Sequence, residues 1–250
     1  MTTSRNARNA AQKTPGRICH RLVSPSDINS SPRERLRAGA AAARRLTAQA
    51  VPDAPGRSSL VKPFPDLIGR TIKLIREQRI IVDGDRVLIA CSGGIDSATL
   101  LFVLNEVRRK TNFDLGIAHV NHRLRRGESD RDEAFVRDAA KGYGLPFFLK
   151  KADVKEYAAS HGLSLQHAGR DIRYLFLNEV ADNAGFTRIA MAHNLDDQIE
   201  TFLLRLIKGT GLRGLSSIPP VRDRIIRPFL GIYRSEIVSF AEQNSIPFVL

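Results

Sequence analysis

Short apolar runs alternate with helical patterns along most of the chain. The apolar run at 87–90 is typical of a strand buried on both faces, because it lacks the polar alternation of a half-exposed strand. Further strands are predicted at 113–120, 146–149 and 187–191. Apolar residues at helical spacings predict helices at 64–75, 98–109, 129–141, 153–160, 167–183, 201–208 and 234–243. This alternation predicts an α/β fold, a doubly wound, mostly parallel five-stranded sheet with helices on both faces.

Residues 1–60 differ from the rest of the chain and predict a disordered basic extension. They are rich in Arg, Ala, Ser, Asn and Pro and lack a sustained hydrophobic period. Three explanations compete: an organelle transit segment, a basic arm that adds affinity for RNA, and a start site placed too early, with Val61 as the alternative initiation site. We favour the last, because the segment carries no hydrophobic face.

The remaining boundaries follow from the same pattern. We expect the main domain over 61–230, and we expect 231–250 to begin a helical linker to a further region. The apolar run Ile246–Leu250 is typical of the start of another strand, and no polar exit follows it. The sequence therefore predicts that the chain is incomplete at its C-terminus.

Composition narrows the class of protein. The chain has a net charge of +13, and residues 1–60 carry 11 Lys and Arg against 3 Asp and Glu. This surplus is compatible with a nucleic-acid partner. No apolar run approaches the length of a membrane span, so we expect no membrane partner. Cys19 and Cys91 form neither a CxxC motif nor a metal set, which favours a cytoplasmic location unless residues 1–60 direct the protein to an organelle.

The stretch Val87–Ser97 predicts an anion-binding site. A buried strand breaks at two glycines and a helix follows at once, so free N–H groups and the positive end of the helix dipole meet at the turn. Ser92 and Ser97 add hydroxyl donors. The GxxxxGK[ST] spacing of a Walker loop is missing, and Asp96 would repel a phosphate unless a divalent metal bridges the two. The alternative is a tight βα turn in which Asp96 or Ser97 only caps the helix.

A second polar cluster follows the apolar run at 187–191. His193, Asp196, Asp197 and Glu200 have the i, i+3, i+4 and i+7 spacing of one helix face, and carboxylate oxygens suit Mg²⁺. Because the cluster follows a strand, we expect it at the same edge of the sheet as the glycine turn. As an alternative, acids in a first helical turn interact favourably with the helix dipole and need no metal. That alternative does not explain His193 and Glu200, so we favour a metal site.

Three further signals are weaker. His119 and Asn121 stand where a strand ends, the edge at which α/β sheets bind ligands, although a solvated exit loop has the same composition. Arg170 and Arg173 share a helix face that suits a carboxylate or phosphate, although solvated basic faces are common. Gly209–Gly214 contains GxGxxG, but no strand precedes it, so we interpret it as a flexible loop over the site and not as a dinucleotide motif.

The stretch Ser92–Ser97 resembles the SGGxDS loop of the N-type ATP pyrophosphatases, or PP-loop superfamily. These enzymes cleave ATP between the α and β phosphates and transfer AMP to a substrate. Further segments resemble the tRNA(Ile)-lysidine synthetases, in order and in spacing: His119–Arg125, Glu128-Ser129, Ala168–Tyr174, Ala192–Thr201 and Gly209–Gly214. The resemblance covers residues 64–250.

The resemblance implies a two-step reaction. Enzymes of this family use ATP and Mg²⁺ to adenylate the C2 carbonyl of the wobble cytidine in a tRNA(Ile) with a CAU anticodon. The amine of L-lysine then displaces AMP and leaves lysidine. Two steps are needed because a carbonyl oxygen is a poor leaving group, whereas AMP is a good one. A homodimer is compatible with this resemblance.

The resemblance also implies roles for single residues. The pyrophosphate loop would comprise Ser92, Gly93, Gly94, Ile95, Asp96 and Ser97. His119 and Asn121 would line the adenosine pocket. Asp96 would reach the pyrophosphate through Mg²⁺, and Arg173 and Asp197 would bind lysine or stabilise the adenylated intermediate. The magnesium ligands would be drawn from Asp96, Asp196, Asp197 and Glu200. The loop Gly209–Gly214 would shape the cytidine pocket.

Two other functions compete with lysidine synthesis. The first is an SGG-type tRNA thiolase or another AMP-forming ligase, although the cysteine patterns that thiolases need are absent from the sequence. The second is a non-catalytic RNA-binding module with a vestigial nucleotide fold. Such a module should have lost acids such as Asp96 and Asp197, and both are present.

Overall fold

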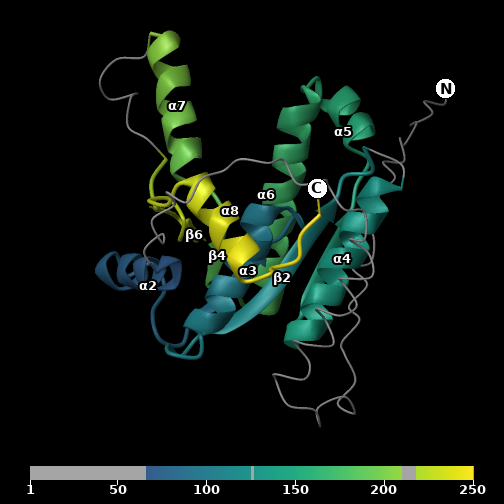
Figure 1. Cartoon of the computed structure of the whole chain (residues 1–250). Helices are drawn as coiled ribbons and strands as arrows, with labels where there is room; N and C mark the ends of the chain where they lie inside the picture. The colour runs from purple at the N-terminus through teal and green to yellow at the C-terminus, as the bar shows by residue number, and fades with distance from the viewer. Residues whose placement is uncertain (1–65, 125–126, 210–217, 250) are drawn as a thin grey trace, which may run out of the picture.

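The computed structural model describes residues 66–124, 127–209 and 218–249 and shows an α/β sandwich (Figure 1). Its sheet has the strand order β3-β2-β1-β4-β6-β5. The strands are β1 (Arg86–Ala90), β2 (Asp114–Asn121), β3 (Phe147–Lys151), β4 (Arg188–Ala190), β5 (Val221–Arg222) and β6 (Ile225–Ile226). All neighbours pair in parallel except β5 and β6. The prediction of a mostly parallel sheet is therefore confirmed. The sheet has six strands where five were predicted, because β5 and β6, of two residues each, form a hairpin at one edge.

Helices cover both faces of the sheet, as expected for a doubly wound fold. They are α2 (Leu67–Glu77), α3 (Ile95–Val107), α4 (Glu128–Tyr143), α5 (Val154–His161), α6 (Leu165–Ala184), α7 (Leu195–Ile207) and α8 (Arg234–Gln243). Val87 and Ile89 of β1 pack on one face with side chains of α2, α3, α4 and α8. Leu88 points to the other face and packs against α6. This alternation of neighbouring residues explains why β1 is apolar from residue 87 to residue 90.

The carboxyl ends of the central strands meet at one edge of the sheet. Ala90 is in register with Ala118, and Ile89 is in register with Ala190. The N–H of Cys91 donates to the Ala118 carbonyl at 2.9 Å, which extends the pairing by one residue. The segments that follow β1, β2 and β4 therefore begin side by side, and these segments carry the predicted site residues.

The segment after α8 differs from its prediction. Residues 246–249 form no strand, so the strand expected over Ile246–Leu250 is wrong within the part that the structure describes. Ile246 instead packs with Ala98 and Ala241 between α3 and α8, and Phe102 meets Phe240 with ring centroids 6.0 Å apart. The apolar side chains of this run pack against α3 and α8, and the run does not pair in the sheet.

α7 is the most exposed element of the fold and projects away from the sheet (Figure 1). No residue of α7 is buried, and Ile207 is 81% exposed. The other exposed apolar side chains of α7 are Ile199, Phe202, Leu203, Leu204 and Leu206. In the described part of the chain, no helix is both long and apolar enough to cross a membrane. The predicted basic extension, residues 1–60, lies outside the described residues.

Candidate active site

The glycine turn forms a loop whose amides point to one hydroxyl. Ser97 Oγ accepts hydrogen bonds from the N–H groups of Ser92 and Gly93, each at 3.2 Å. Gly93 has a φ of +95°, which favours glycine. Gly94 is the N-cap of α3 and has no side chain to satisfy the N–H groups of the first helical turn. These N–H groups, with the positive end of the helix dipole, suit an oxyanion.

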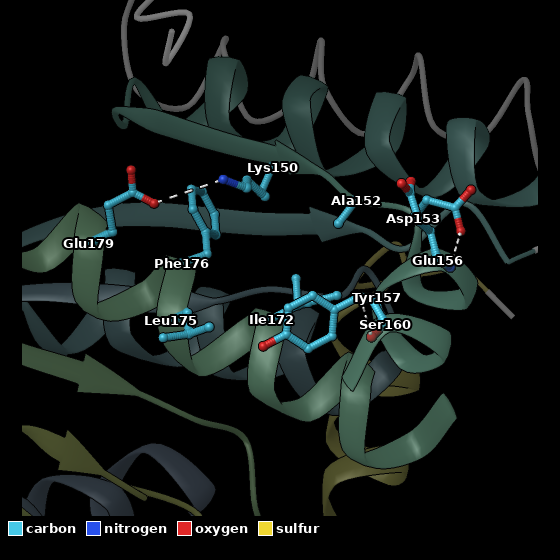
Figure 2. A pocket seen from close by; sticks show the side chains of 10 residues that line it. All are labelled: Lys150, Ala152, Asp153, Glu156, Tyr157, Ser160, Ile172, Leu175, Phe176 and Glu179. Carbon is cyan, nitrogen blue, oxygen red and sulfur yellow. Dashed lines mark hydrogen bonds and ion pairs between the residues drawn. The ribbon is translucent and has the colours of Figure 1, made fainter. Parts of the chain in front are cut away.

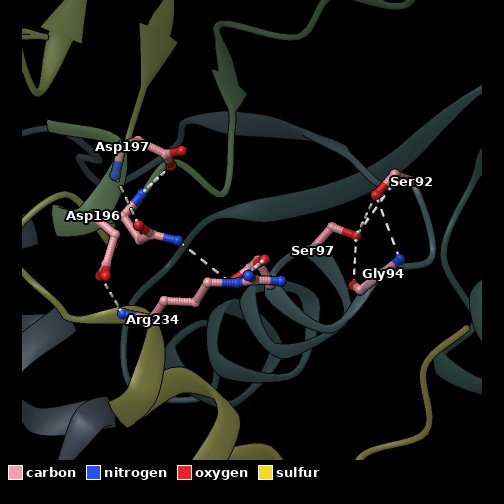
Figure 3. A network of polar contacts seen from close by, with 8 residues as sticks. Ser92, Gly94, Ser97, Asp196, Asp197 and Arg234 are labelled. Atoms are coloured by element: carbon pink, nitrogen blue, oxygen red, sulfur yellow. Dashed lines mark hydrogen bonds and ion pairs between the residues drawn. The ribbon is translucent and has the colours of Figure 1, made fainter. Parts of the chain in front are cut away.

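Asp96 stands in the first turn of α3 and faces the segment after β4. Its carboxylate lies 3.5 Å from the guanidinium of Arg234 and 3.4 Å from the Asn194 amide, which donates to it. The pKa of Asp96 is raised, mainly because the carboxyl group is buried, and the charge of Asp197 adds to this rise. The charge of Arg234 and the hydrogen bond from Asn194 lower the pKa in part. Figure 3 shows Arg234 extending between the serines of the loop and the acids of α7.

Asn194 connects the two predicted clusters. Its side chain accepts the Asp197 N–H at 3.2 Å, and Asp197 Oδ2 accepts the Asn194 N–H at 2.8 Å, which is a capping box at the start of α7. The same Asn194 side chain reaches Asp96. The structure therefore brings Asp96 and Asp197 to one place, as the sequence predicts for acids at a common edge.

The other two predicted metal ligands are placed differently. Asp196 Oδ2 accepts the backbone N–H of Arg234 at 2.7 Å, and Glu200 is exposed farther along α7. Among the described residues, no three His, Cys, Asp or Glu side chains are arranged to hold a metal ion. The geometry thus favours Asp96 and Asp197 over Asp196 and Glu200 as ligands.

Replacing Asn194 by alanine should lower both stability and activity. The variant loses a helix cap, which costs about 1 kcal/mol of unfolding free energy, and it frees the Asp96 carboxylate from a fixed position. Ser164→Ala is the matched control, because Ser164 caps α6 through the His167 N–H at 3.3 Å and lies outside the site. We expect urea unfolding to show similar losses of unfolding free energy in the two variants. Only Asn194→Ala should slow ATP-dependent pyrophosphate release, by about tenfold. Equal rates in the two variants would exclude a positioning role for Asn194.

His119 and Asn121 lie at the end of β2 in different environments. His119 is buried, its Nδ1 lies 2.9 Å from the Cys91 carbonyl, and its Nε2 is buried without a hydrogen-bond partner. Burial lowers the pKa of His119, so the neutral ring is favoured. The Asn121 amide donates to Asp130 at 3.0 Å and to Glu133 at 2.9 Å. His119 therefore has a free ring nitrogen for a ligand, whereas the amide of Asn121 holds the start of α4.

His122 should make folding sensitive to acid. Burial, with the charges of Arg173 and His119, lowers the pKa of His122 to about 4. An unfolded histidine titrates near 6.5, so between pH 6.5 and 4 the unfolded state binds more protons and stability falls as the pH falls. We expect a loss of about 1–3 kcal/mol, since His122 is only partly buried.

Urea midpoints at pH 7 and pH 5 measure this loss. His122→Gln should remove part of it, while His167→Gln, at an exposed histidine, should not. The pKa values of the buried His119 and the half-buried His193 are also lowered, and both residues remain in both variants. An identical pH dependence of wild type and His122→Gln would contradict the assignment.

Basic side chains gather beside this edge on α6 and after β6. Arg170 lies over the Tyr174 ring, with its guanidinium carbon 4.9 Å from the ring centroid, and the exposed Arg173 lies on the same helix. Arg227 Nε donates to His193 Nδ1 at 3.2 Å. The basic group predicted at Arg170 and Arg173 thus also includes Arg227, which was not predicted from the sequence.

Three residues of the site were missed from the sequence. Asn194 could have been found, because Asn three residues before Asp197 is a capping pattern. Arg227 and Arg234 reach the site from later segments, and no local pattern marks them. The loop Gly209–Gly214 lies, except for Gly209, outside the described residues.

A hollow of about 400 Å³ lies between β3, α5 and α6 (Figure 2). Lys150 and Glu179 form an ion pair of 4.0 Å across it, and the exposed Leu175 forms part of its wall. None of the site residues described above lines this hollow. Volume alone therefore does not locate the site, which is defined by the strand ends and their polar groups.

Comparisons with known proteins identify the family of this chain. The family described as PP-loop domain matches residues 67–250. A tRNA(Ile)-lysidine synthase from Dehalococcoides mccartyi is 42% identical over 189 residues, which cover 72% of this chain and 40% of that protein. One from Petrotoga mobilis is 37% identical over 184 residues, which cover 74% of this chain and 59% of that protein. The chain thus spans only part of the length of these relatives.

A solved structure shares the fold. The U34-tRNA thiolase NcsA from Methanococcus maripaludis, with its [4Fe-4S] cluster, has a TM-score of 0.59 and 22% sequence identity. The match covers 73% of this chain and 65% of that one. At this level of identity the likeness concerns the arrangement of strands and helices.

Proposed function

This chain belongs to the PP-loop domain family, and we propose that it is the ATP-dependent part of a tRNA(Ile)-lysidine synthase. In this proposal, ATP adenylates the C2 carbonyl oxygen of the wobble cytidine of tRNA(Ile) with a CAU anticodon and releases pyrophosphate. The ε-amine of L-lysine then attacks C2, and AMP leaves. The observation that carries the proposal is the identity of 42% and 40% to two proteins with that name, over 72% and 71% of this chain.

The loop between β1 and α3 would hold the pyrophosphate. The free N–H groups at the start of α3, the helix dipole and the hydroxyls of Ser92 and Ser97 would stabilise the charge that develops on the leaving group. Gly93 and Gly94 let the backbone approach the phosphates closely. Ile95 contributes its N–H, because its side chain belongs to the packing between α3 and α8.

Asp96 and Asp197 fit a magnesium ion. Each acid raises the energy of the other, and the pKa of Asp96 is raised, so a cation near them would favour the ionised forms. A bound Mg²⁺ would neutralise charge on the pyrophosphate as it departs. We place Asp196 and Glu200 outside this pair, because both are exposed, whereas Asp197 is half-buried and its charge acts on Asp96.

The remaining roles concern the adenosine and the second substrate. His119, with its unpartnered Nε2, would hydrogen-bond the adenosine. Asn121 would act by holding the loop that follows β2. Arg173 and Asp197 would bind lysine or stabilise the adenylated intermediate, because they supply opposite charges at the same edge.

We also propose a cytoplasmic location and a homodimer. The buried Cys91 is a free thiol, which suits a reducing compartment. α7 offers a surface for self-association, because Ile199, Phe202 and Leu206 are exposed at helical spacing. Its first half is acidic and its last turns are basic, so an antiparallel pair would place opposite charges together. Sedimentation at rising concentration tests the homodimer.

The decisive experiment measures the product. The chain is incubated with a tRNA(Ile) transcript with a CAU anticodon, ATP, Mg²⁺ and labelled lysine, and the nucleosides are analysed. We expect labelled lysidine, and no label with a transcript that has uridine at the wobble position. A 2-thiocytidine product would indicate the thiolase alternative. A folded, ATP-binding protein that incorporates no lysine would contradict the proposal.

A further inference from the structure

Arg227 is a buried cation whose partners are all neutral. It is 4% exposed and follows β6 at the carboxyl edge of the sheet. Nε donates to His193 Nδ1 at 3.2 Å, Nη1 donates to the Pro219 carbonyl at 2.7 Å, and Tyr174 is a further hydrogen-bond partner. A guanidinium has five N–H donors, so about two remain for another acceptor.

This arrangement is unusual for a buried charge. A guanidinium removed from water is normally paired with a carboxylate, because neutral acceptors offset only part of the cost of desolvation. Arg188, which is half-buried, follows that rule, because its Nε lies 3.5 Å from the Asp85 carboxylate. Within the described residues Arg227 forms no such ion pair.

The surroundings of Arg227 favour the binding of an anion. Burial lowers the pKa of Arg227, Tyr174 opposes this shift, and the charges of Arg222 and Arg170 lower the pKa further. Because His193 accepts a hydrogen bond at Nδ1, its ring is neutral and its proton is on Nε2, which is a donor. Asp197 is the acid that acts on His193, and it lies toward Asp96. The basic group therefore adjoins the acidic pair that faces the loop.

We propose that Arg227, positioned by His193 and Tyr174, binds the α-carboxylate of the amino-acid substrate. This inference rests on the proposed function and names the group that recognises its second substrate. A carboxylate fits the planar fork of a guanidinium with two parallel hydrogen bonds. Because Arg227 is only 4% exposed, an anion that pairs with it must be small, which favours a free amino acid over the backbone of a folded RNA. Asp197, whose charge also acts on His193, would face an ammonium group of the same molecule.

The test compares lysine with cadaverine, which is lysine without its carboxylate. Dissociation constants are measured by calorimetry for the full chain with α,β-methylene-ATP and Mg²⁺. We expect the wild type to bind lysine at least tenfold more tightly than cadaverine. Arg227→Gln should weaken lysine binding about 10–100-fold and change cadaverine binding less than twofold. Arg224→Gln, in the same hairpin but with an exposed ion pair, should leave both unchanged.

Several results would overturn the inference. Equal affinity of the wild type for lysine and cadaverine would do so even if Arg227→Gln failed to fold. Loss of both affinities in a folded variant would show a general structural role for Arg227. A raised KM for tRNA with unchanged lysine affinity would show that Arg227 binds RNA. If the wild type binds lysine selectively but forms no lysidine, the proposed function fails while the carboxylate site stands.

Discussion

Asp96→Asn should abolish the pyrophosphate release that depends on lysine and tRNA. The substitution removes a negative charge at the point where the proposed function puts the Mg²⁺ and the departing pyrophosphate. Loss of one preorganised electrostatic group of this kind costs about 100- to 1,000-fold in rate, and loss of the metal with it costs more. We therefore expect a fall of about 1,000-fold or more, measured by a coupled assay for pyrophosphate.

The fold should survive this substitution. Asparagine is isosteric with aspartate and keeps an oxygen that can accept from the Asn194 amide. The repulsion between Asp96 and Asp197 disappears. The freed Arg234 side chain is 61% exposed and remains solvated, so the unfolding free energy should change by less than about 1 kcal/mol.

Asp182→Asn provides the matched control for Asp96→Asn. Asp182 makes the same type of pairing, with Arg224 at 2.7 Å, but on an exposed surface. The Asp182→Asn variant should keep the full rate of pyrophosphate release. Normal turnover by folded Asp96→Asn protein would refute the role of Asp96, and a similar loss in both variants would show that the effect is not specific to the site.

Gly93→Ala should destabilise the fold and weaken ATP binding. An added Cβ would lie 2.8 Å from Cγ2 of Val249 and 3.3 Å from Cγ2 of Val136, and the φ of +95° is unfavourable for alanine. Backbone strain and crowding together should lower the unfolding free energy by about 2–4 kcal/mol. Thermal unfolding measures this loss, and titration with α,β-methylene-ATP should show about a tenfold weaker complex.

Gly94→Ala separates the two effects. Gly94 has a φ of −67°, and a Cβ there would meet only Ser92 Oγ, at 3.7 Å. Its thermal stability should stay near that of wild type, while an alanine methyl group at the phosphate site should still weaken ATP binding. Adding Val249→Ala to Gly93→Ala should recover part of the lost stability, because it removes the closest clash. No recovery in the double variant would assign the whole cost to the backbone.

The sheet could be predicted because burial on both faces imposes a simple pattern. Residues 87–90 of β1 are a continuous apolar run, and residues 115–118 of β2 are apolar or glycine, so the place of both strands in a parallel sheet was visible in the sequence. The hairpin of β5 and β6 was not, because two residues per strand are too few to show any period. The run at 246–249 was misassigned for a related reason, since an apolar segment has the same composition whether it pairs in a sheet or packs on α3.

The candidate site was predictable only where its determinants are local. The glycine turn and Asp96 belong to one continuous stretch, and the structure places them as expected. The helix-face argument for His193 does not apply, because α7 begins at Leu195 and His193 precedes its cap. Arg227 and Arg234 come from distant segments, and their contacts depend on the completed sheet.

The contact of Val249 with Gly93 bears on how the protein acquires its loop during synthesis. The Val249 N–H donates to the Gly93 carbonyl at 3.0 Å, so a residue near the end of the described chain helps to fix a turn made far earlier. Ribosomes release the earlier segment first, and such a long-range pairing must wait for its later partner. A nascent chain arrested before residue 249 should thus carry a formed central sheet with an unfinished phosphate loop, and ATP could stabilise only the later, longer chains.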